Sequence, residues 1–271
     1  FDSFGHTQGL VQILNKTGYD SYIFCRPLVP MMNLPHMFFE WKGLDGSSVK
    51  AARFEDDSIY CSDLGKAVEN IKRKMRPWEG EDVAFALWGI GNHGGGPSRK
   101  DLAEVGEFMQ EQLGNGVQIM HSTPEQFFAA ATPKASLDGA LQPCFVKCYT
   151  SVSTLKRRYA ELEDKLLMTE KICARAAMET DFVYDKKAMD EAQRIMAMIQ
   201  FHDVLSGTSI LEGNVSSLRK ADYALEILDE QFSRAFFKLY EGWERGKGGE
   251  YPFAVFNPHP YEIDGVFDLE M

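Results

Sequence analysis

A stripe of apolar and small residues in the second half of the chain most constrains its fold. These residues recur at alternating spacings of four and three: Leu155, Tyr159, Leu162, Leu166, Thr169, Cys173 and Ala176. Such spacing places them on one face of a helix, and a partner helix must cover that face. The pattern therefore predicts helix packed on helix in this part of the chain.

Two further amphipathic helices are predicted downstream. One begins at Asp185 and has apolar residues on one side: Met189, Ala192, Met196 and Ile199. The other carries a longer apolar stripe: Leu218, Ala221, Leu225, Leu228, Phe232, Phe236, Leu239 and Trp243. Three amphipathic helices joined by modest connections indicate an antiparallel three-helix bundle, which we expect over residues 134–248. We interpret the Met and aromatic stripes as its core.

Residues 1–133 have a different character, because strand-like and helix-like stretches alternate there. Residues 22–25 and 83–88 are continuous apolar runs, typical of strands buried on both faces. Ser98 and Thr123-Pro124 are helix-start signals, since a hydroxyl can cap the first turn and proline suits its first position. The alternation predicts a parallel α/β sheet or barrel. Residues 132–139 are interpreted as a linker.

The two ends of the chain also suggest its organisation. Residues 253–258 and 266–269 have the composition of opening strands, so we expect a β domain to begin at residues 249–271. The chain starts at Phe1 and stops at Met271 within a strand-like run. We therefore interpret it as a fragment of a longer protein.

Composition excludes some partners and suggests a compartment. The net charge of −11 argues against nucleic acid, whose phosphates would be repelled, and no stretch approaches the ~20 apolar residues of a membrane span. Five cysteines without a framework spacing favour reduced thiols and a cytoplasmic location: Cys25, Cys61, Cys144, Cys148 and Cys173. A homo-oligomer is compatible with the sequence.

Three short segments carry chemistry-bearing residues beside glycine-containing turns. They are Asp2-Ser3-Phe4-Gly5-His6, the glycine-rich residues 89–97, and residues 201–208, which read Phe-His-Asp-Val-Leu-Ser-Gly-Thr. Together they resemble the zinc-dependent α-mannosidases of glycoside hydrolase family 38. The resemblance implies part of an α/β barrel-like catalytic domain, then the three-helix bundle, then the first strands of a β-sandwich domain.

The resemblance also implies roles for individual residues. Asp2 corresponds to a residue that is both a zinc ligand and the nucleophile, His202 to a second zinc ligand, and Asp203 to a residue that binds sugar hydroxyls. Two further ligands would come from a His-x-Asp pair, which does not occur in this chain and is expected upstream. Taken alone, Asp2 has the composition of a turn residue, and His202 that of a helix-end residue facing terminal carbonyls.

The general acid/base is not assigned. Family members with a recognised acid place an aspartate where this chain has Asn92 and His93, and an asparagine cannot donate a proton in that role. We include Asn92 and His93 as residues that line the substrate site. Asp101 and Glu104 are candidates for the acid only if their helix turns inward.

Three other residues lie near the predicted strands. Arg26 and Trp41 are predicted to bind substrate, because strand ends in barrels point at the active site and a tryptophan face suits a sugar ring. His6 is predicted to have a structural or sugar-contacting role rather than to bind metal. Asp45-Gly46 is typical of a hairpin turn.

The expected function is that of a retaining zinc-dependent α-mannosidase acting on a mannose-containing glycan or α-mannoside, with this fragment inactive by itself. A zinc-dependent carbohydrate deacetylase is an alternative, in which the metal activates water and no covalent sugar intermediate forms. The three-helix bundle and the segment around His202 favour the mannosidase. The other alternative is a non-catalytic carbohydrate-binding protein of the same fold.

Overall fold

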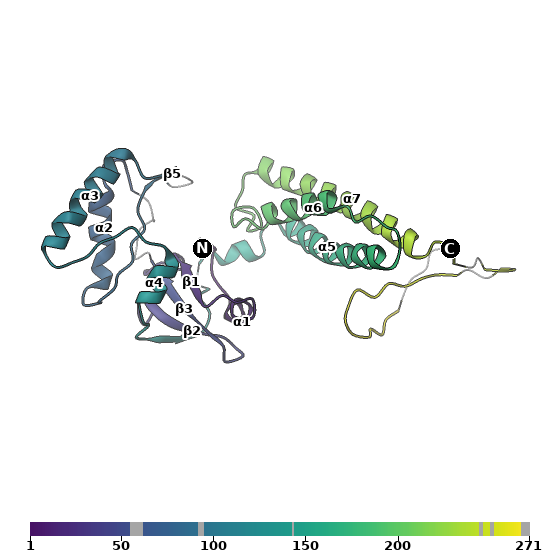
Figure 1. The fold of residues 1–271 in the computed structure, drawn as a ribbon, viewed down its shortest axis with the longest axis horizontal. Coiled ribbons are helices and arrows are strands. Elements are labelled where there is room, and N and C mark those ends of the chain that lie inside the picture. Colours follow the sequence, from purple (N-terminus) through teal and green to yellow (C-terminus); the bar gives the residue numbers. More distant parts are fainter. Residues whose placement is uncertain (55–61, 92–94, 143, 244–245, 250–251, 267–271) are drawn as a thin grey trace. The chain divides into compact units, whose positions relative to one another are not determined.

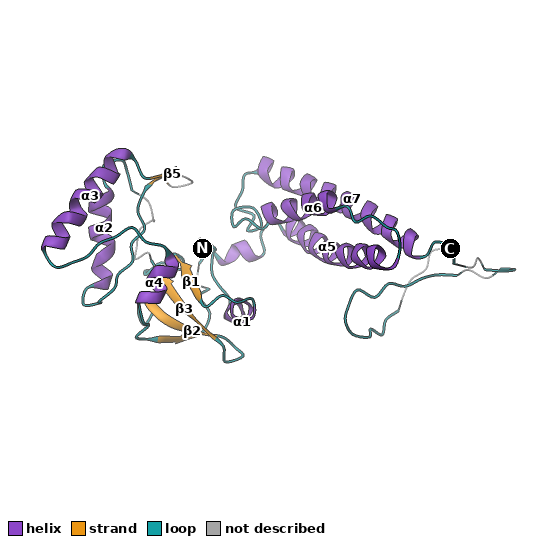
Figure 2. Cartoon of the chain, in the orientation of Figure 1, coloured by secondary structure: helices purple, strands orange, loops and turns teal. Residues whose placement is uncertain are grey.

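The structure is a computed structural model that describes residues 1–54, 62–91, 95–142, 144–243, 246–249 and 252–266. Two compact units divide the chain, Phe1–Val146 and Lys147–Met271. The first unit combines helices with a sheet, and the regular structure of the second is helical (Figures 1 and 2).

A four-stranded mixed sheet, in the order β1-β3-β2-β6, organises the first unit. Strand β1 (Ser21–Phe24) pairs in parallel with β3 (Ser48–Arg53), which pairs antiparallel with β2 (Phe38–Lys42). Strand β6 (Ser136–Asp138) pairs in parallel with β2. The segment expected to be a linker therefore holds an edge strand of this sheet, because its backbone completes the hydrogen bonding of β2.

Helices cover both faces of the sheet. Helix α1 (Gly9–Lys16) packs on one face and α4 (Pro124–Ala130) on the other. Side chains of successive strand residues point to opposite faces, so Phe39 lies beneath α1 while Phe38 contacts Phe127 of α4. The apolar run at residues 22–25 predicted such burial for β1, where Tyr22 and Phe24 lie in the cluster beneath α1 and Ile23 packs against the cluster of α4.

A second layer of the unit contains two packed helices and short elements. These elements are α2 (Ala67–Met75), η1 (Arg76–Trp78), β4 (Ile90–Gly91), β5 (Gly95–Gly96) and α3 (Arg99–Gly114). The side chain of Ser98 accepts a hydrogen bond from the amide of Asp101, so the predicted N-cap of α3 is confirmed. The predicted helix start at Thr123 is also confirmed, because Thr123 and Gln126 form a capping box at the start of α4.

Residues 83–88 do not form the predicted strand. Their backbone has no ladder partner among the described residues, and the nearest pairing is a bridge between Ser62 and Ile90. An apolar run becomes a strand only where a neighbouring strand takes its N–H and C=O groups. Val83 and Phe85 instead pack as half-buried side chains against the cluster around Phe127.

The second unit contains three long helices. Their bounds, with the short helix before them, are η2 (Val146–Tyr149), α5 (Ser153–Glu179), α6 (Lys186–Ile199) and α7 (Leu211–Leu239). Ion pairs join Arg158 of α5 to Asp222 of α7 and Lys165 of α5 to Asp229 of α7. Residue numbers therefore increase in the same direction along the two helices. The two helices are parallel, and all three pack together (Figure 1).

Helix α6 runs opposite to α5. Gln200, directly after α6, donates a hydrogen bond to the hydroxyl of Tyr159 near the start of α5. The predicted stripe of α5 faces the core, with five members buried: Leu155, Leu162, Thr169, Cys173 and Ala176. Trp243 was predicted to continue the stripe of α7, but the helix ends at Leu239 and Trp243 is exposed.

Core packing in this unit yields a stability prediction. Leu228 is 0% exposed in the cluster shared by the three helices, so Leu228→Ala should lower the free energy of unfolding by about 2–5 kcal/mol. Phe232 is only half-buried, with the Lys165 ammonium over its ring. Phe232→Ala should therefore lower the free energy of unfolding by less than Leu228→Ala. Phe237→Ala is the control, because that ring is 73% exposed. Equal urea midpoints for Leu228→Ala and Phe237→Ala would contradict this packing.

Residues 252–266 form no strand, although the composition of residues 253–258 predicted one. Side chains such as Phe253 and Val255 are more than half exposed, and no segment that the structure describes pairs with this backbone as a ladder would. The second predicted strand, at residues 266–269, falls mainly outside the described residues.

Two predictions from composition can be compared with the described residues. Cys25, Cys148 and Cys173 are thiols outside any disulfide, as predicted for them. Within the described parts of the chain, no helix is both long and apolar enough to cross a membrane.

Candidate active site

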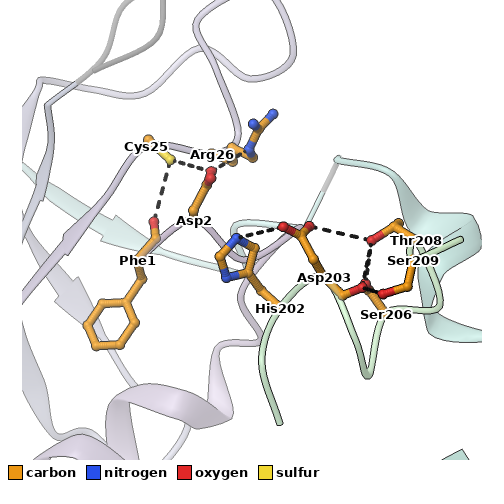
Figure 3. Close-up of polar contacts among 9 residues, drawn as sticks. All are labelled: Phe1, Asp2, Cys25, Arg26, His202, Asp203, Ser206, Thr208 and Ser209. Carbon is orange, nitrogen blue, oxygen red and sulfur yellow. Dashed lines mark hydrogen bonds and ion pairs between the residues drawn. The ribbon is translucent and has the colours of Figure 1, made fainter. Parts of the chain in front are cut away.

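Asp2 lies beside the residues that follow β1. The amide of Cys25 donates to the carbonyl oxygen of Phe1 at 3.2 Å, which holds this first segment along the strand end. Oδ1 of Asp2 accepts two hydrogen bonds, from Nε of Arg26 at 2.6 Å and from Sγ of Cys25 at 2.9 Å (Figure 3). The Asp2 side chain is 22% exposed, so this carboxylate is held in place yet reachable from solvent.

Arg26 supplies positive charge to this carboxylate. A guanidinium at hydrogen-bond distance favours the ionised form of an aspartate. The same guanidinium carbon lies 5.7 Å from the ring centroid of Phe4 and 5.8 Å from that of Phe145, so two aromatic rings flank it. Arg26 was predicted to bind substrate. The structure gives it a different contact, with Asp2, and a contact with substrate stays a prediction.

Cys25 contacts Asp2 in the candidate site, a role that was not predicted from the sequence. Its side chain is buried, and burial, with the hydrogen bond to Asp2, raises the pKa of the thiol to about 12. The thiol is therefore protonated at neutral pH and donates to the carboxylate. Its position directly after a buried strand and before Arg26 is the sequence signal that points to it.

His6 is a structural residue of this segment. Nε2 donates to the carbonyl oxygen of Arg26 at 2.9 Å, and the Tyr22 hydroxyl donates to Nδ1 at 2.8 Å. These partners define the neutral tautomer with hydrogen on Nε2. Backbone hydrogen bonds in both directions also join His6 to Leu141. The imidazole is buried with both nitrogens in use, so His6 braces the strand end that holds Asp2.

The buried imidazole of His6 should make stability depend on pH. Burial lowers the pKa of His6 from 6.5 to about 4, so only the unfolded chain takes up a proton between these values. Stability is therefore lost as the pH falls from about 6.5 to about 4, by about 3 kcal/mol in total. His6→Gln keeps a donor and an acceptor but does not titrate. Its unfolding free energy, measured in urea at pH 7.5 and pH 5, should fall less than that of the wild type, and equal losses would contradict the prediction.

Trp41 was predicted to bind substrate, and the structure contradicts this. Its side chain is 0% exposed, beneath α1, and Nε1 donates to the carbonyl oxygen of Gly139 at 2.8 Å. A ring without exposed surface cannot stack on a sugar. Strand β2 places Trp41 on the same face as Phe39, which explains its burial.

Asp101 anchors two helices and is not available as an acid. Its buried carboxylate accepts hydrogen bonds from the Ser98 hydroxyl and from the amides of Gly65 and Ala67 at the start of α2. The hydrogen bond from Ser98 foremost lowers the pKa of Asp101. Glu104 forms an ion pair with Lys100 on the same helix. Neither residue supports the assignment of an acid.

Asn92 and His93, predicted to line the substrate site, lie outside the described residues. The glycines around them form the β4–β5 hairpin, in which Ile90 pairs with Gly96 and Gly91 with Gly95. A Cβ on Gly95 would lie 2.0 Å from the carbonyl oxygen of Ile90, so only glycine fits there. The predicted Asp45-Gly46 turn joins β2 to β3, with Asp45 accepting from the amide and hydroxyl of Ser47.

His202 and Asp203 lie in the turn that follows α6. Nε2 of His202 is 3.7 Å from Oδ2 of Asp203, and the His202 ring packs on Phe201. The carbonyl oxygen of Asp203 accepts from the hydroxyls of Thr208 at 3.3 Å and Ser209 at 2.5 Å (Figure 3). The side chains of His202 and Asp203 are 29% and 39% exposed, so the turn presents both to solvent.

The donor types of Asp2 and His202 suit zinc, which takes carboxylate oxygen and imidazole nitrogen. Their number does not suffice, because a protein zinc site has three or four ligands. Among the described residues no group of three or more His, Cys, Asp or Glu side chains could hold a metal ion. Zinc binding by Asp2 and His202 stays a prediction.

Comparison with known families settles the relationship. A family model described as "Glycosyl hydrolases family 38 N-terminal domain" matches residues 1–147, more than half of the chain. The chain belongs to glycoside hydrolase family 38. A second model, described as "Alpha mannosidase middle domain", matches residues 144–239. The resemblance seen in the three segments of the sequence is thereby confirmed.

Curated relatives of this family 38 chain are α-mannosidases by name. It is 28% identical to human "Alpha-mannosidase 2C1", 27% identical to "Alpha-mannosidase G" of Dictyostelium discoideum and 26% identical to "Alpha-mannosidase" of Saccharomyces cerevisiae. Each alignment covers 77% of this chain. The chain spans only 20–21% of the length of these relatives.

Solved structures of the family share the fold. The crystal structure of an alpha-mannosidase from Enterococcus faecalis V583 superposes with a TM-score of 0.71 at 17% identity, covering 89% of this chain and 29% of that one. A second Enterococcus faecalis protein of glycosyl hydrolase family 38 gives a TM-score of 0.61 at 16% identity, covering 87% of this chain and 26% of that one.

Proposed function

We propose that the protein hydrolyses terminal α-mannosides with retention of configuration, and that Asp2 is the nucleophile. The observation that carries the proposal is the setting of Asp2 in a family 38 chain, where Arg26 and Cys25 both donate to Oδ1 at the end of β1. A nucleophilic carboxylate must be ionised, oriented and reachable. The two contacts support the first two requirements, and the 22% exposure of the Asp2 side chain supports the third.

The proposed reaction proceeds in two displacements. A carboxylate oxygen of Asp2 forms a bond to the anomeric carbon while the bond from that carbon to the departing oxygen breaks, and a general acid protonates the departing oxygen. In the second displacement the group that acted as the acid accepts a proton from water, the water oxygen bonds to the anomeric carbon, the bond from that carbon to Asp2 breaks, and the product keeps its configuration. Arg26 and Cys25 hold Asp2 throughout. The acid/base is not assigned.

Zinc is the proposed cofactor, with Asp2 and His202 as its donors in this chain and a His-x-Asp pair expected elsewhere in the complete protein. When bound, the metal would supply positive charge that orients sugar hydroxyls. Asp203 is proposed to bind hydroxyls of the mannose, since its half-exposed carboxylate is held next to His202. The free thiols support a reducing compartment, and we propose the cytoplasm.

An assay on the longest polypeptide that the coding sequence specifies tests this proposal. The protein should release the aryl group from an aryl α-mannoside, and proton NMR should show the α-anomer of mannose as the first product. An acetylated sugar serves as substrate for the deacetylase alternative. Release of acetate without cleavage of the mannoside would favour that alternative, and binding of mannosides without turnover of either would favour the non-catalytic one.

A further inference from the structure

The turn that carries His202 and Asp203 is tied to the start of α5. Nζ of Lys156 donates to the carbonyl oxygen of Leu205 at 2.9 Å and to that of Ser151 at 2.5 Å. Lys156 therefore joins two segments 49 positions apart in the sequence. The hydroxyl of Ser151 adds a hydrogen bond to the carbonyl oxygen of Ser206 at 2.5 Å.

The two joined segments also interlock sterically. Val152, which precedes α5, has a φ of +45°, a strained conformation for a β-branched residue. A Cβ on Gly207, whose φ is +77°, would lie 2.8 Å from both Cγ2 of Val152 and Oγ of Ser151. Strain of this kind persists only when surrounding contacts enforce it, and Lys156 binds the carbonyl directly before Val152.

Packing beneath the turn completes its support. The side chains of Val204 and Leu205 pack against the core cluster of the three helices. Lys156 is itself half-buried, so its ammonium bonds the carbonyls in partly desolvated surroundings, where charge-assisted hydrogen bonds are strong. His202 and Asp203, which are partly exposed, therefore lie in a turn that is held by contacts with the start of α5.

We propose that Lys156 is the positioning residue of the turn that carries His202 and Asp203. By bonding Leu205 and Ser151 together, it fixes where the imidazole and carboxylate project, without touching substrate or metal itself. The effect on turnover rests on the proposed function. The effect on the turn does not, because it concerns hydrogen bonds from the Lys156 side chain to carbonyl oxygens of the same unit.

The test replaces Lys156 by methionine, which keeps the length of the side chain and removes its donors. Lys165→Met is the matched control, since Lys165 lies on the same helix and pairs with Asp229 beside the ring of Phe232. Three quantities are measured on the longest form of the protein: the melting temperature, amide hydrogen exchange over residues 203–208, and kcat and KM for an aryl α-mannoside.

We expect both variants to lower the melting temperature by similar amounts. Only Lys156→Met should speed amide exchange over residues 203–208, by about tenfold or more, and lower kcat/KM by about 10- to 100-fold, as loss of a supporting residue does. Lys156→Arg keeps the charge and the donors and should recover most of both losses. If Lys156→Met does not fold, Lys156→Gln takes its place in the comparison with Lys165→Met.

The outcomes separate this inference from the proposed function. If the wild type cleaves no mannoside, the proposed function fails and the exchange measurement alone decides the role of Lys156. Exchange over residues 203–208 that is equal in Lys156→Met and Lys165→Met would overturn the inference. So would an active wild type whose kcat/KM is lowered no more by Lys156→Met than by Lys165→Met.

Discussion

Replacing Asp2 by asparagine should lower kcat for an aryl α-mannoside by at least about a thousandfold. An amide does not attack the anomeric carbon, and it brings no negative charge to the Arg26 guanidinium beside it. Arg26 and Cys25 both donate to Oδ1, and an amide oxygen can accept the same hydrogen bonds. The variant should therefore fold normally, so that the loss reports chemistry rather than unfolding.

Two measurements make this test specific. Asp20→Asn changes an exposed carboxylate of the same unit and should leave kcat within twofold. A slowly hydrolysed fluorinated mannosyl donor should label the wild type but not Asp2→Asn, and mass spectrometry should place the label on the peptide that contains Asp2. Turnover of Asp2→Asn within tenfold of the wild type, or a label on another carboxylate, would remove Asp2 from the role of nucleophile.

The elements that the sequence predicted well are those set by local signals. The four-and-three spacing from Leu155 to Ala176 defines one helix face regardless of its partners, and the structure buries that face. Ser98 and Thr123 begin helices because their hydroxyls bond amides only three residues away. Helix capping and helical spacing depend only on residues of the same segment, so the sequence of that segment is enough to predict them.

The predictions that failed depend on neighbours distant in sequence. Residues 83–88 and 253–258 have strand-like composition, but composition does not provide the partner that a strand requires. Trp41 follows the alternation of β2, yet only the packing of α1 decides that its face of the sheet is buried.

The candidate site was predicted in part for the same reason. The sequence motifs identify Asp2, His202 and Asp203. The groups that hydrogen-bond to Asp2 and to the turn of His202 belong to other segments, which only folding brings beside them. Cys25 bonds Asp2 across 23 positions, and Lys156 bonds Leu205 across 49. Neither lies in a motif, so the tertiary structure is needed to connect them with the site.

Removal of zinc should abolish activity and separate the roles of the histidines. Dialysis of the longest form against a chelator should lower kcat/KM by at least about a hundredfold, and added zinc should restore it. His202→Ala should weaken zinc binding, measured by competition with a chromophoric chelator, by more than the roughly 10- to 100-fold that loss of a supporting residue costs. The reason is that His202→Ala removes a ligand atom, whereas loss of a supporting residue only disturbs the orientation of a ligand.

His259→Ala is the control for His202→Ala, because His259 lies in the same unit, is exposed and stacks on Tyr261. It should bind zinc as the wild type does. The 271-residue chain alone has two proposed donors, and two donors do not make a tight zinc site, so it should bind zinc weakly and show negligible activity. Unchanged zinc affinity in His202→Ala would exclude His202 as a ligand. Tight stoichiometric binding by the 271-residue chain would contradict the two-donor assignment, because further ligands would then have to lie within it.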